Sequence, residues 1–187
     1  GYQSRFLAKR YRKFVDKVRK AELEKLGGDA KAALTEAVAR YYFKLLAYKD
    51  EYEVARLHSD PAFRAEIASR FEGNYQLNFH LAPPLTAKVD PKIGKPVKKR
   101  YGPSMMRNFT WLAKLRWLRA TPLDPFGYTA ERKTERALIR DYRQTIESLL
   151  GRLDAGNQAL AVEIASVPDR IRGYGHVKDR HLVEARA

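Results

Sequence analysis

The stretch LDPFGYTAERKTERALIRDY, Leu123–Tyr142, carries the clearest fold signal in the chain. Pro125 disfavours a helical conformation at the residue before it, and Thr129 is suited to cap a helix that begins directly afterwards. We expect Gly127 to provide a positive φ in the turn. The stretch therefore predicts a turn followed by a long helix that ends near Leu153.

This helix repeats a basic residue at every fourth position: Arg132, Arg136 and Arg140. Like charges four residues apart on a helix repel by a few tenths of a kcal/mol per pair, so we expect acidic partners. An acidic patch occurs earlier in the chain: Asp50, Glu51 and Glu53. We predict that the two groups face each other and that the helix after Thr129 packs near the helix containing Tyr48. Two alternatives stay open: the arginines bind a phosphate or an acidic protein, or the acids act as paired carboxylates or hold a hard metal.

Other segments also have helical periodicity. The expected helices cover residues 2–26, 30–58, 61–72, 104–119 and 157–167, with a short one after the GYG at 173–175. Asp29 and Asp60 are the expected N-caps, and Pro61 suits a first helical position. In the helix over 104–119 we expect Phe109 to face the core. Its basic residues are expected to face solvent: Arg107, Lys114, Arg116 and Arg119.

One segment has the period of a strand. Apolar and polar residues alternate over Tyr75–Leu81, as in a half-buried strand, and two prolines follow. The basic, turn-rich segment 86–103 then predicts an exposed excursion that returns at Arg100 and Tyr101. The expected fold class is mainly α, a helical domain with one small antiparallel strand pair or hairpin.

Composition limits the class of protein. The chain has 187 residues, no Cys, and 37 Lys and Arg against 22 Asp and Glu, a net charge of +15. We expect a single domain over 1–187, with a basic N-terminal helix in 1–28 and the main body in 29–187. The absence of Cys excludes disulfides and Cys-ligated clusters within this chain.

We find no signal peptide or apolar span and expect a cytoplasmic location and no membrane partner. The first residue, Gly1, leads us to expect a piece of a longer protein.

The positive charge is concentrated in two segments. Nine basic and three acidic residues lie in 1–25, and six basic residues accompany Asp90 in 88–100. Such segments attract acidic partners or nucleic acid. No recognised nucleic-acid module is visible, so a basic nucleic-acid-binding helical module is kept as the alternative function.

Catalytic motifs are weak. GYGHVK, residues 173–178, lacks the spacing of a dinucleotide or P-loop fingerprint and is interpreted as a tight turn. His176 and His181 are five residues apart, which does not suit two metal ligands on one helix face. His80 with nearby acids would suit a stand-alone hydrolase, and Ser104 lacks the flanks of a nucleophile elbow. We therefore assign no catalytic, cofactor-binding or metal-binding residue.

Five stretches, in order, resemble one family. They are YYFKLLAYKDEYEVARLHSDPAF, FEGNYQLNFHLAPPL, KKRYGP, TPLDPFGYTAERKTERALI and IRGYGHVK. Together they cover about residues 40–178 and resemble the C-terminal region of the indolepyruvate ferredoxin oxidoreductases whose subunits are fused in one chain. Five ordered stretches are more specific than any single short motif.

The resemblance implies a parent enzyme that oxidatively decarboxylates arylpyruvates to acyl-CoA. Thiamine diphosphate with magnesium would perform the carbon chemistry, and [4Fe–4S] clusters would pass electrons to ferredoxin. This chain lacks the cysteines of the clusters, and GGDAKAALTE lacks the rest of a thiamine diphosphate motif. We therefore expect an accessory domain without cofactors of its own. Its expected partners are the catalytic domains of the parent and ferredoxin, with a role in assembly or acceptor docking.

Overall fold

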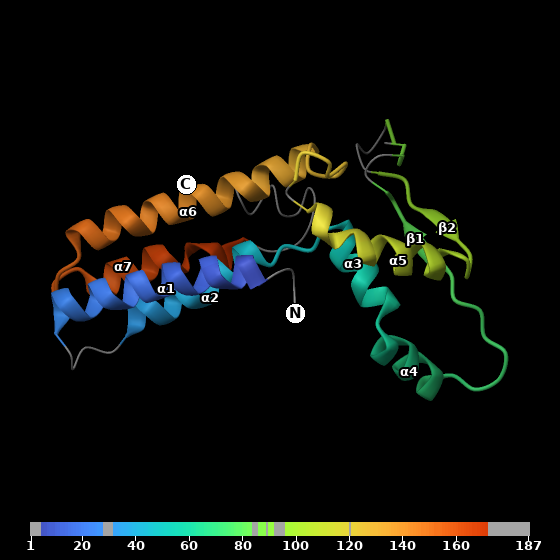
Figure 1. Ribbon diagram of the computed structural model, residues 1–187, viewed down its shortest axis with the longest axis horizontal. Helices are drawn as coiled ribbons and strands as arrows, with labels where there is room; N and C mark the ends of the chain where they lie inside the picture. Colours follow the sequence, from blue (N-terminus) through green and yellow to red (C-terminus); the bar gives the residue numbers. More distant parts are fainter. Residues whose placement is uncertain are drawn as a thin grey trace. The chain divides into compact units, whose positions relative to one another are not determined.

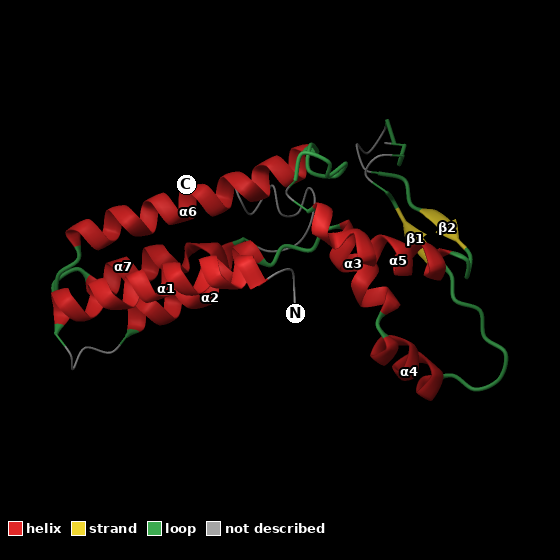
Figure 2. Ribbon diagram, in the orientation of Figure 1, coloured by secondary structure: helices red, strands yellow, loops and turns green. Residues whose placement is uncertain are grey.

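The computed structural model describes residues 5–27, 32–83, 86–88, 90–91, 96–119 and 121–171. Within these ranges the protein is mainly helical, with one two-stranded antiparallel sheet (Figures 1 and 2). This confirms the expected fold class. The chain divides into two compact units. Unit 1 combines the described residues up to Tyr48 with those from Lys133 onward, and unit 2 is Lys49–Arg132. The single domain with a separate N-terminal segment stays a prediction.

Unit 1 is a group of helices around one apolar core. It contains α1 (Arg5–Leu26), α2 (Ala33–Leu46), most of α6 (Ala130–Arg152), α7 (Gln158–Ser166) and the short 3-10 helix η2 (Val167–Arg170). The four α-helices of the unit contribute apolar side chains to this core. Its members include Phe14, Leu34, Tyr42, Tyr142, Ile146 and Leu153. Leu138, Tyr142 and Ile146 of α6 are in this core because a period of 3.6 places them on one face of the helix.

A buried carboxylate ties three helices of unit 1 together. Glu22 on α1 is 1% exposed and accepts hydrogen bonds from the backbone N–H groups of Leu34 and Thr35, each at 2.9 Å. The Thr35 hydroxyl donates to it at 2.6 Å, and the Gln158 side chain on α7 donates at 3.1 Å. Ala32 occupies the N-cap position of α2 and has no capping side chain, so Glu22 performs that role from a neighbouring helix. Asp29, the predicted cap, lies outside the described residues.

The helix predicted over 30–58 is wrong as a single element. The structure has α2, a break at residues 47–50, and then α3 (Glu51–Ser59). Asp50 causes the new start, because its side chain accepts the backbone N–H of Glu53 at 2.8 Å. An aspartate that bonds the amide three residues later is a standard N-cap, and here it outweighs the continuous apolar pattern.

Unit 2 is built from short elements. These are α3, α4 (Pro61–Arg70), β1 (Phe79–Leu81), β2 (Lys99–Tyr101), α5 (Met105–Lys114) and the 3-10 helix η1 (Leu115–Leu118). Asp60 caps α4 by accepting the N–H of Ala62 at 2.9 Å, with Pro61 at the first position, as predicted. The chain leaves α4 through Gly73, whose φ of 75° is in the left-handed region that favours glycine.

The strand prediction is right in place and too long. Only Phe79–Leu81 forms a strand, pairing antiparallel with β2 so that Phe79 lies opposite Tyr101 and Leu81 opposite Lys99. Phe79 is buried and the next residue, His80, is exposed, which preserves the predicted alternation. The return of the excursion at residues 100 and 101 is confirmed.

Candidate functional site

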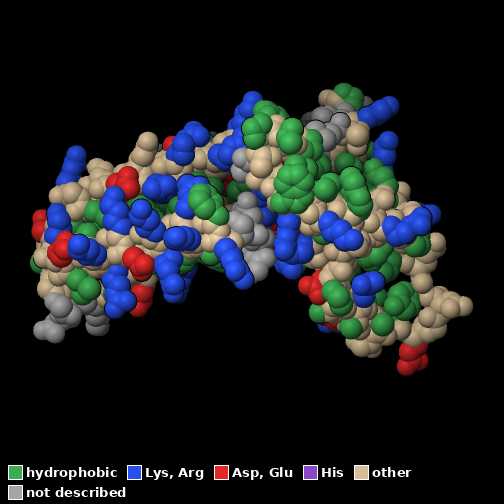
Figure 3. All heavy atoms as spheres, in the orientation of Figure 1, with side chains coloured by type: hydrophobic (Ala, Val, Ile, Leu, Met, Phe, Trp, Pro, Cys, Tyr) green, Lys and Arg blue, Asp and Glu red, His purple; other side chains and the backbone are tan. Residues whose placement is uncertain are grey.

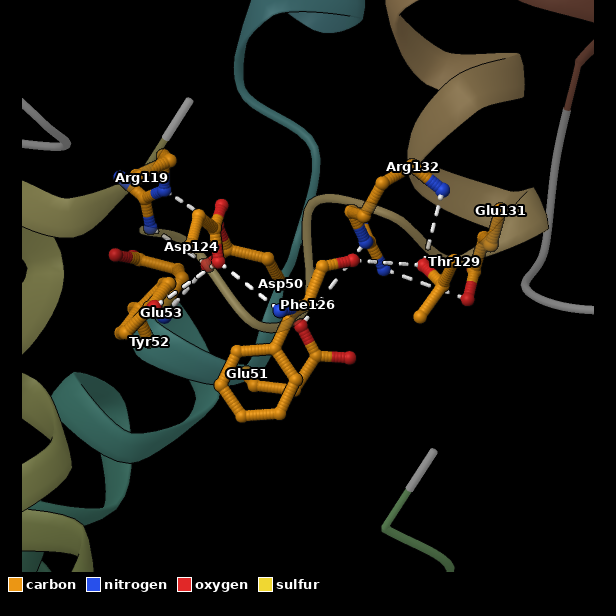
Figure 4. A network of polar contacts seen from close by, with 10 residues as sticks. All are labelled: Asp50, Glu51, Tyr52, Glu53, Arg119, Asp124, Phe126, Thr129, Glu131 and Arg132. Atoms are coloured by element: carbon orange, nitrogen blue, oxygen red, sulfur yellow. Dashed lines mark hydrogen bonds and ion pairs between the residues drawn. The ribbon is translucent and has the colours of Figure 1, made fainter. Parts of the chain in front are cut away.

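Asp50 lies at the centre of a buried polar network in unit 2 (Figure 4). Besides capping α3, its carboxylate accepts two hydrogen bonds from the guanidinium of Arg119, one to each oxygen. The Nη2–Oδ1 distance is 2.6 Å, and both side chains are almost fully buried. The prediction that Arg119 faces solvent is wrong. The helix ends at Leu118, which turns the next side chain inward toward the carboxylate.

The turn before α6 is held by a second buried carboxylate. Asp124 Oδ1 accepts the hydroxyl of Tyr52 at 3.0 Å and the backbone N–H of Phe126 at 3.1 Å. The ring of Phe126 meets Tyr52 edge to face, with centroids 5.4 Å apart. Burial and the hydrogen bond to Asp124 raise the pKa of the Tyr52 hydroxyl, so it remains a proton donor. A Cβ at Gly127 would meet Asp124 Oδ2 at 3.2 Å.

The reason predicted for a glycine at position 127, a positive φ, is therefore wrong. Among the described glycines only Gly27 and Gly73 have positive φ values. Gly127 is required by the closeness of the Asp124 carboxylate, not by the backbone conformation. Thr129 behaves as predicted, because its hydroxyl accepts the N–H of Arg132 at 3.4 Å at the start of α6.

The predicted approach of the arginine column to the acidic patch is seen at Arg132. Arg132 is buried, and its Nε lies 4.0 Å from Glu51 Oε2, while its Nη2 lies 3.4 Å from Glu131 Oε2. This confirms the expected approach of the start of α6 to the acidic patch. The other acids have different partners, since Asp50 binds Arg119 and Glu53 forms a two-point ion pair with Arg56.

The remaining arginines of the column are not part of this site. Arg136 and Arg140 belong to unit 1, whereas the three acids belong to unit 2. Arg140 is exposed. The sequence pattern thus grouped three arginines that the fold assigns to two bodies, and it missed Arg119, Tyr52 and Asp124.

A cavity of about 300 Å³ lies beside the network and is lined only by residues of unit 2. Its apolar wall comes from α3, α5, the end of β1 and the turn before α6: Val54, Leu81, Met105, Phe109, Leu112 and Phe126. Its polar side groups five charged residues: Lys49, Asp50, Glu51, Glu131 and Arg132. An apolar pocket with a few polar groups on one side is the usual form of a small-molecule site.

Glu51 lies on the polar side of this cavity. Burial raises the pKa of its carboxyl, and its own backbone N–H and the Arg132 guanidinium oppose part of that rise. Within the part of the chain that the structure describes, its Oε2 is buried without a hydrogen-bond partner. Such an oxygen loses the water it would have on the surface, so a donor that reached it would be favoured.

His58 on α3 lies in an aromatic cluster that includes Phe109, a residue of the cavity wall. Its ring stacks on Phe109 with centroids 5.0 Å apart and meets Phe63 and Phe79 edge to face. Its Nδ1 is buried without a hydrogen-bond partner within the described ranges, and burial lowers the pKa of the imidazole. The surroundings are those of a neutral packing residue. The sequence around His58 did not indicate that its side chain packs in an aromatic cluster.

The other sequence candidates do not meet at this site. His80 is exposed in β1, and Ser104 is exposed in the turn before α5. Neither residue lines the cavity. GYGHVK, His176, His181 and the expected terminal helix lie outside the described residues, as do Lys92 and Lys95. The hydrolase alternative required His80 in a deep pocket beside a carboxylate, and it is dropped.

The described residues contain neither a membrane-spanning helix nor a metal-binding cluster. No described helix has the length and apolar character needed to traverse a bilayer. Nor do the described residues contain a group of three or more His, Cys, Asp or Glu arranged to hold a metal ion. The residues that line the cavity offer hydrogen bonds, charge and apolar contact.

Comparison with known proteins identifies a family whose function is unknown. Residues 1–187 match the profile of DUF6537, a family of unknown function. No curated protein and no solved structure matches the chain.

Proposed function

The chain belongs to the DUF6537 family, and we propose that it is the C-terminal accessory region of an indolepyruvate ferredoxin oxidoreductase with fused subunits. Support for this parentage comes from the five ordered stretches between residues 40 and 178. In this proposal the parent oxidatively decarboxylates arylpyruvates to acyl-CoA and passes electrons to ferredoxin. The accessory region performs no chemistry itself and serves in docking.

A stripe of alternating basic and aromatic side chains supports the docking role. Along α5 and η1, at spacings of four, three and three, it consists of Arg107, Trp111, Lys114 and Trp117. We call it the Arg/Trp stripe. All four residues are exposed, and both tryptophans of the chain, each 66% exposed, belong to it. Tryptophan and arginine are the residues most enriched in the energetic centres of protein interfaces. This is the single observation that carries the docking role.

The surrounding surface has the same mixed character. Figure 3 shows Lys and Arg side chains spread over both units and hydrophobic side chains gathered on the surface of unit 2. Exposed apolar side chains of this size mark interaction sites more often than free surface. We assign the stripe to contact with the catalytic domains of the parent, with their acidic residues facing Arg107 and Lys114.

The parentage is tested first by the complete reading frame that encodes the chain. Cysteines spaced for [4Fe–4S] clusters and a thiamine diphosphate motif in the same polypeptide would support the proposal. A complete frame that encodes neither, in this polypeptide or in an adjoining subunit, would overturn it.

The docking role is tested in the full-length parent. Trp111→Ala combined with Trp117→Ala should raise protease cleavage between this region and the catalytic body at least tenfold. Phe6→Ala combined with Phe43→Ala is the matched control, because both rings are exposed but belong to unit 1. Equal cleavage of the two double variants would exclude the stripe as the interface.

Nucleic-acid binding is the second candidate, since basic residues alternating with tryptophans also suit single strands. The observation in its favour is the same stripe. A gel shift with single-stranded DNA or RNA that persists near physiological salt and is lost on removal of both tryptophans would favour it over docking.

A further inference from the structure

The cavity of unit 2 is the strongest unassigned feature of the molecule. It lies apart from the Arg/Trp stripe, since none of the stripe's four residues lines it. Its volume of about 300 Å³ is at the lower end of the range for small-molecule sites. The site therefore suits a molecule about the size of one or two fused rings.

The apolar wall selects the body of the ligand. Phe109 and Phe126 offer ring faces or edges, and Met105 and Leu112 offer flexible apolar contact. Aromatic and thioether groups favour flat rings over bulky branched groups. A fused aromatic ring would replace water against these residues.

The polar side selects the head group. Three carboxylates line the cavity with two cations, Lys49 and Arg132. Asp50 is already paired with Arg119, so Glu51 and Glu131 are the acids that face the ligand. Arg132 already lies within ion-pair distance of both Glu51 and Glu131. An anionic head group would have to compete with these acids, whereas a cationic donor would meet carboxylate oxygen. Glu51 lines the cavity and, within the described residues, its Oε2 has no hydrogen-bond partner, so its carboxylate is the acceptor that such a donor would meet.

We propose that this cavity binds a small aromatic amine, with its rings against Phe109 and Phe126 and its ammonium group donating to the Glu51 carboxylate. The bound ammonium would supply a hydrogen bond to a carboxylate whose Oε2 has no partner within the described residues. The inference depends only on unit 2 and stands or falls independently of the proposed parentage.

The two methionines of the chain provide the measurement. Met105 lines the cavity, and its neighbour Met106 does not. In protein labelled with ¹³C at the methionine methyl groups, three probes of one ring size are titrated at pH 7: 1-naphthylmethylamine, 1-naphthalenemethanol and 1-naphthylacetate. We expect the Met105 signal to shift more than the Met106 signal. The amine should bind at least tenfold more tightly than the other two probes.

Variants separate the two halves of the site. Glu51→Gln should remove the preference for the amine while the alcohol binds as before. Val54→Phe should weaken all three probes at least tenfold by filling the cavity. Glu66→Gln, on the exposed surface of α4, is the matched control and should leave every affinity unchanged. Folding of each variant is checked by urea unfolding followed by tryptophan fluorescence.

The proposal is overturned by any of three results. These are no Met105 shift with any probe at millimolar concentration, equal binding of the amine and the alcohol, or tightest binding of the carboxylate. The last result would make Arg132 the anchor instead of Glu51. All three results come from the unsubstituted protein, so they decide the proposal even if Glu51→Gln fails to fold.

Discussion

Asp50 and Arg119, 69 positions apart in the chain, form a buried two-point ion pair that joins the start of α3 to the end of η1. The same carboxylate caps α3 through Glu53 N. Glu51 directly follows Asp50 in the chain. The bonds that hold Asp50 therefore also position Glu51 on the polar side of the cavity. The pair is thus a structural element of the candidate site, whatever the site binds.

Arg119→Ala should destabilise unit 2 by about 3–5 kcal/mol, the usual cost of leaving a buried charge without its partner. Arg119→Lys keeps the charge but loses the two-point geometry, so its loss should be smaller. Urea unfolding followed by tryptophan fluorescence is the measurement, since both tryptophans lie in unit 2. Arg116→Ala, at an exposed neighbour, should change the free energy of unfolding by less than about 0.5 kcal/mol. Equal effects at the two positions would contradict the ion pair.

Glu22→Ala should destabilise unit 1 by about 2–4 kcal/mol, because buried amides of α2 and the Gln158 side chain lose their acceptor. Glu22→Gln keeps one acceptor oxygen and should cost less. Chemical unfolding followed by far-UV circular dichroism measures the loss. Glu24→Ala, two residues away and exposed, is the control and should leave the unfolding midpoint nearly unchanged.

Unit 2 should lose stability as the pH falls below about 6.5. Burial lowers the pKa of His58, so the unfolded chain takes up a proton at its ordinary pKa of about 6.5 while the folded chain does not. The loss begins near pH 6.5 and is complete below the lowered folded pKa. His58→Phe, which keeps an aromatic ring against Phe109, should remove this part of the pH dependence. Fluorescence-detected unfolding at pH 5.5 and 7.5 compares the two proteins, and parallel curves would show that His58 is not responsible.

If the proposed parentage is right, the basic segment that returns at β2 should contribute to acceptor binding. Lys98→Glu with Lys99→Glu, and the same changes at Lys92 and Lys95, should raise the KM of the parent for ferredoxin several-fold with little change in kcat. The effect should weaken with rising ionic strength because salt screens exposed charges. Arg64→Glu on α4 is the control for a general change in charge. An unchanged KM in the fourfold variant would exclude this segment from ferredoxin docking.

Local signals in the sequence predicted local structure well. Asp60 with Pro61 and Thr129 before α6 act through hydrogen bonds to amides two or three residues away, so short windows contain the whole interaction. The apolar period of α6 could likewise be recognised without reference to any other segment of the chain. Asp50 before Glu53 is a signal of the same kind. In the prediction a long apolar pattern outweighed it, and this pattern concealed the break between α2 and α3.

Distant partners could not be predicted in the same way. Glu22 caps a helix that begins 11 positions later, and Arg119 binds a carboxylate 69 positions away. Nothing in either local window distinguishes these side chains from the exposed charges around them. The arginine column shows the converse error, because regular spacing on one helix grouped Arg132 with residues that belong to another unit.

The division of the chain has a consequence for its synthesis. Unit 2 is one uninterrupted stretch, whereas unit 1 is assembled from segments on both sides of it. On the ribosome, the inserted body is complete by Arg132, and the outer bundle must wait for Gln158 before Glu22 acquires its last donor. The early helices α1 and α2 thus expose apolar faces until the residues after Arg132 have been synthesised, which makes them the natural segments for a chaperone to protect.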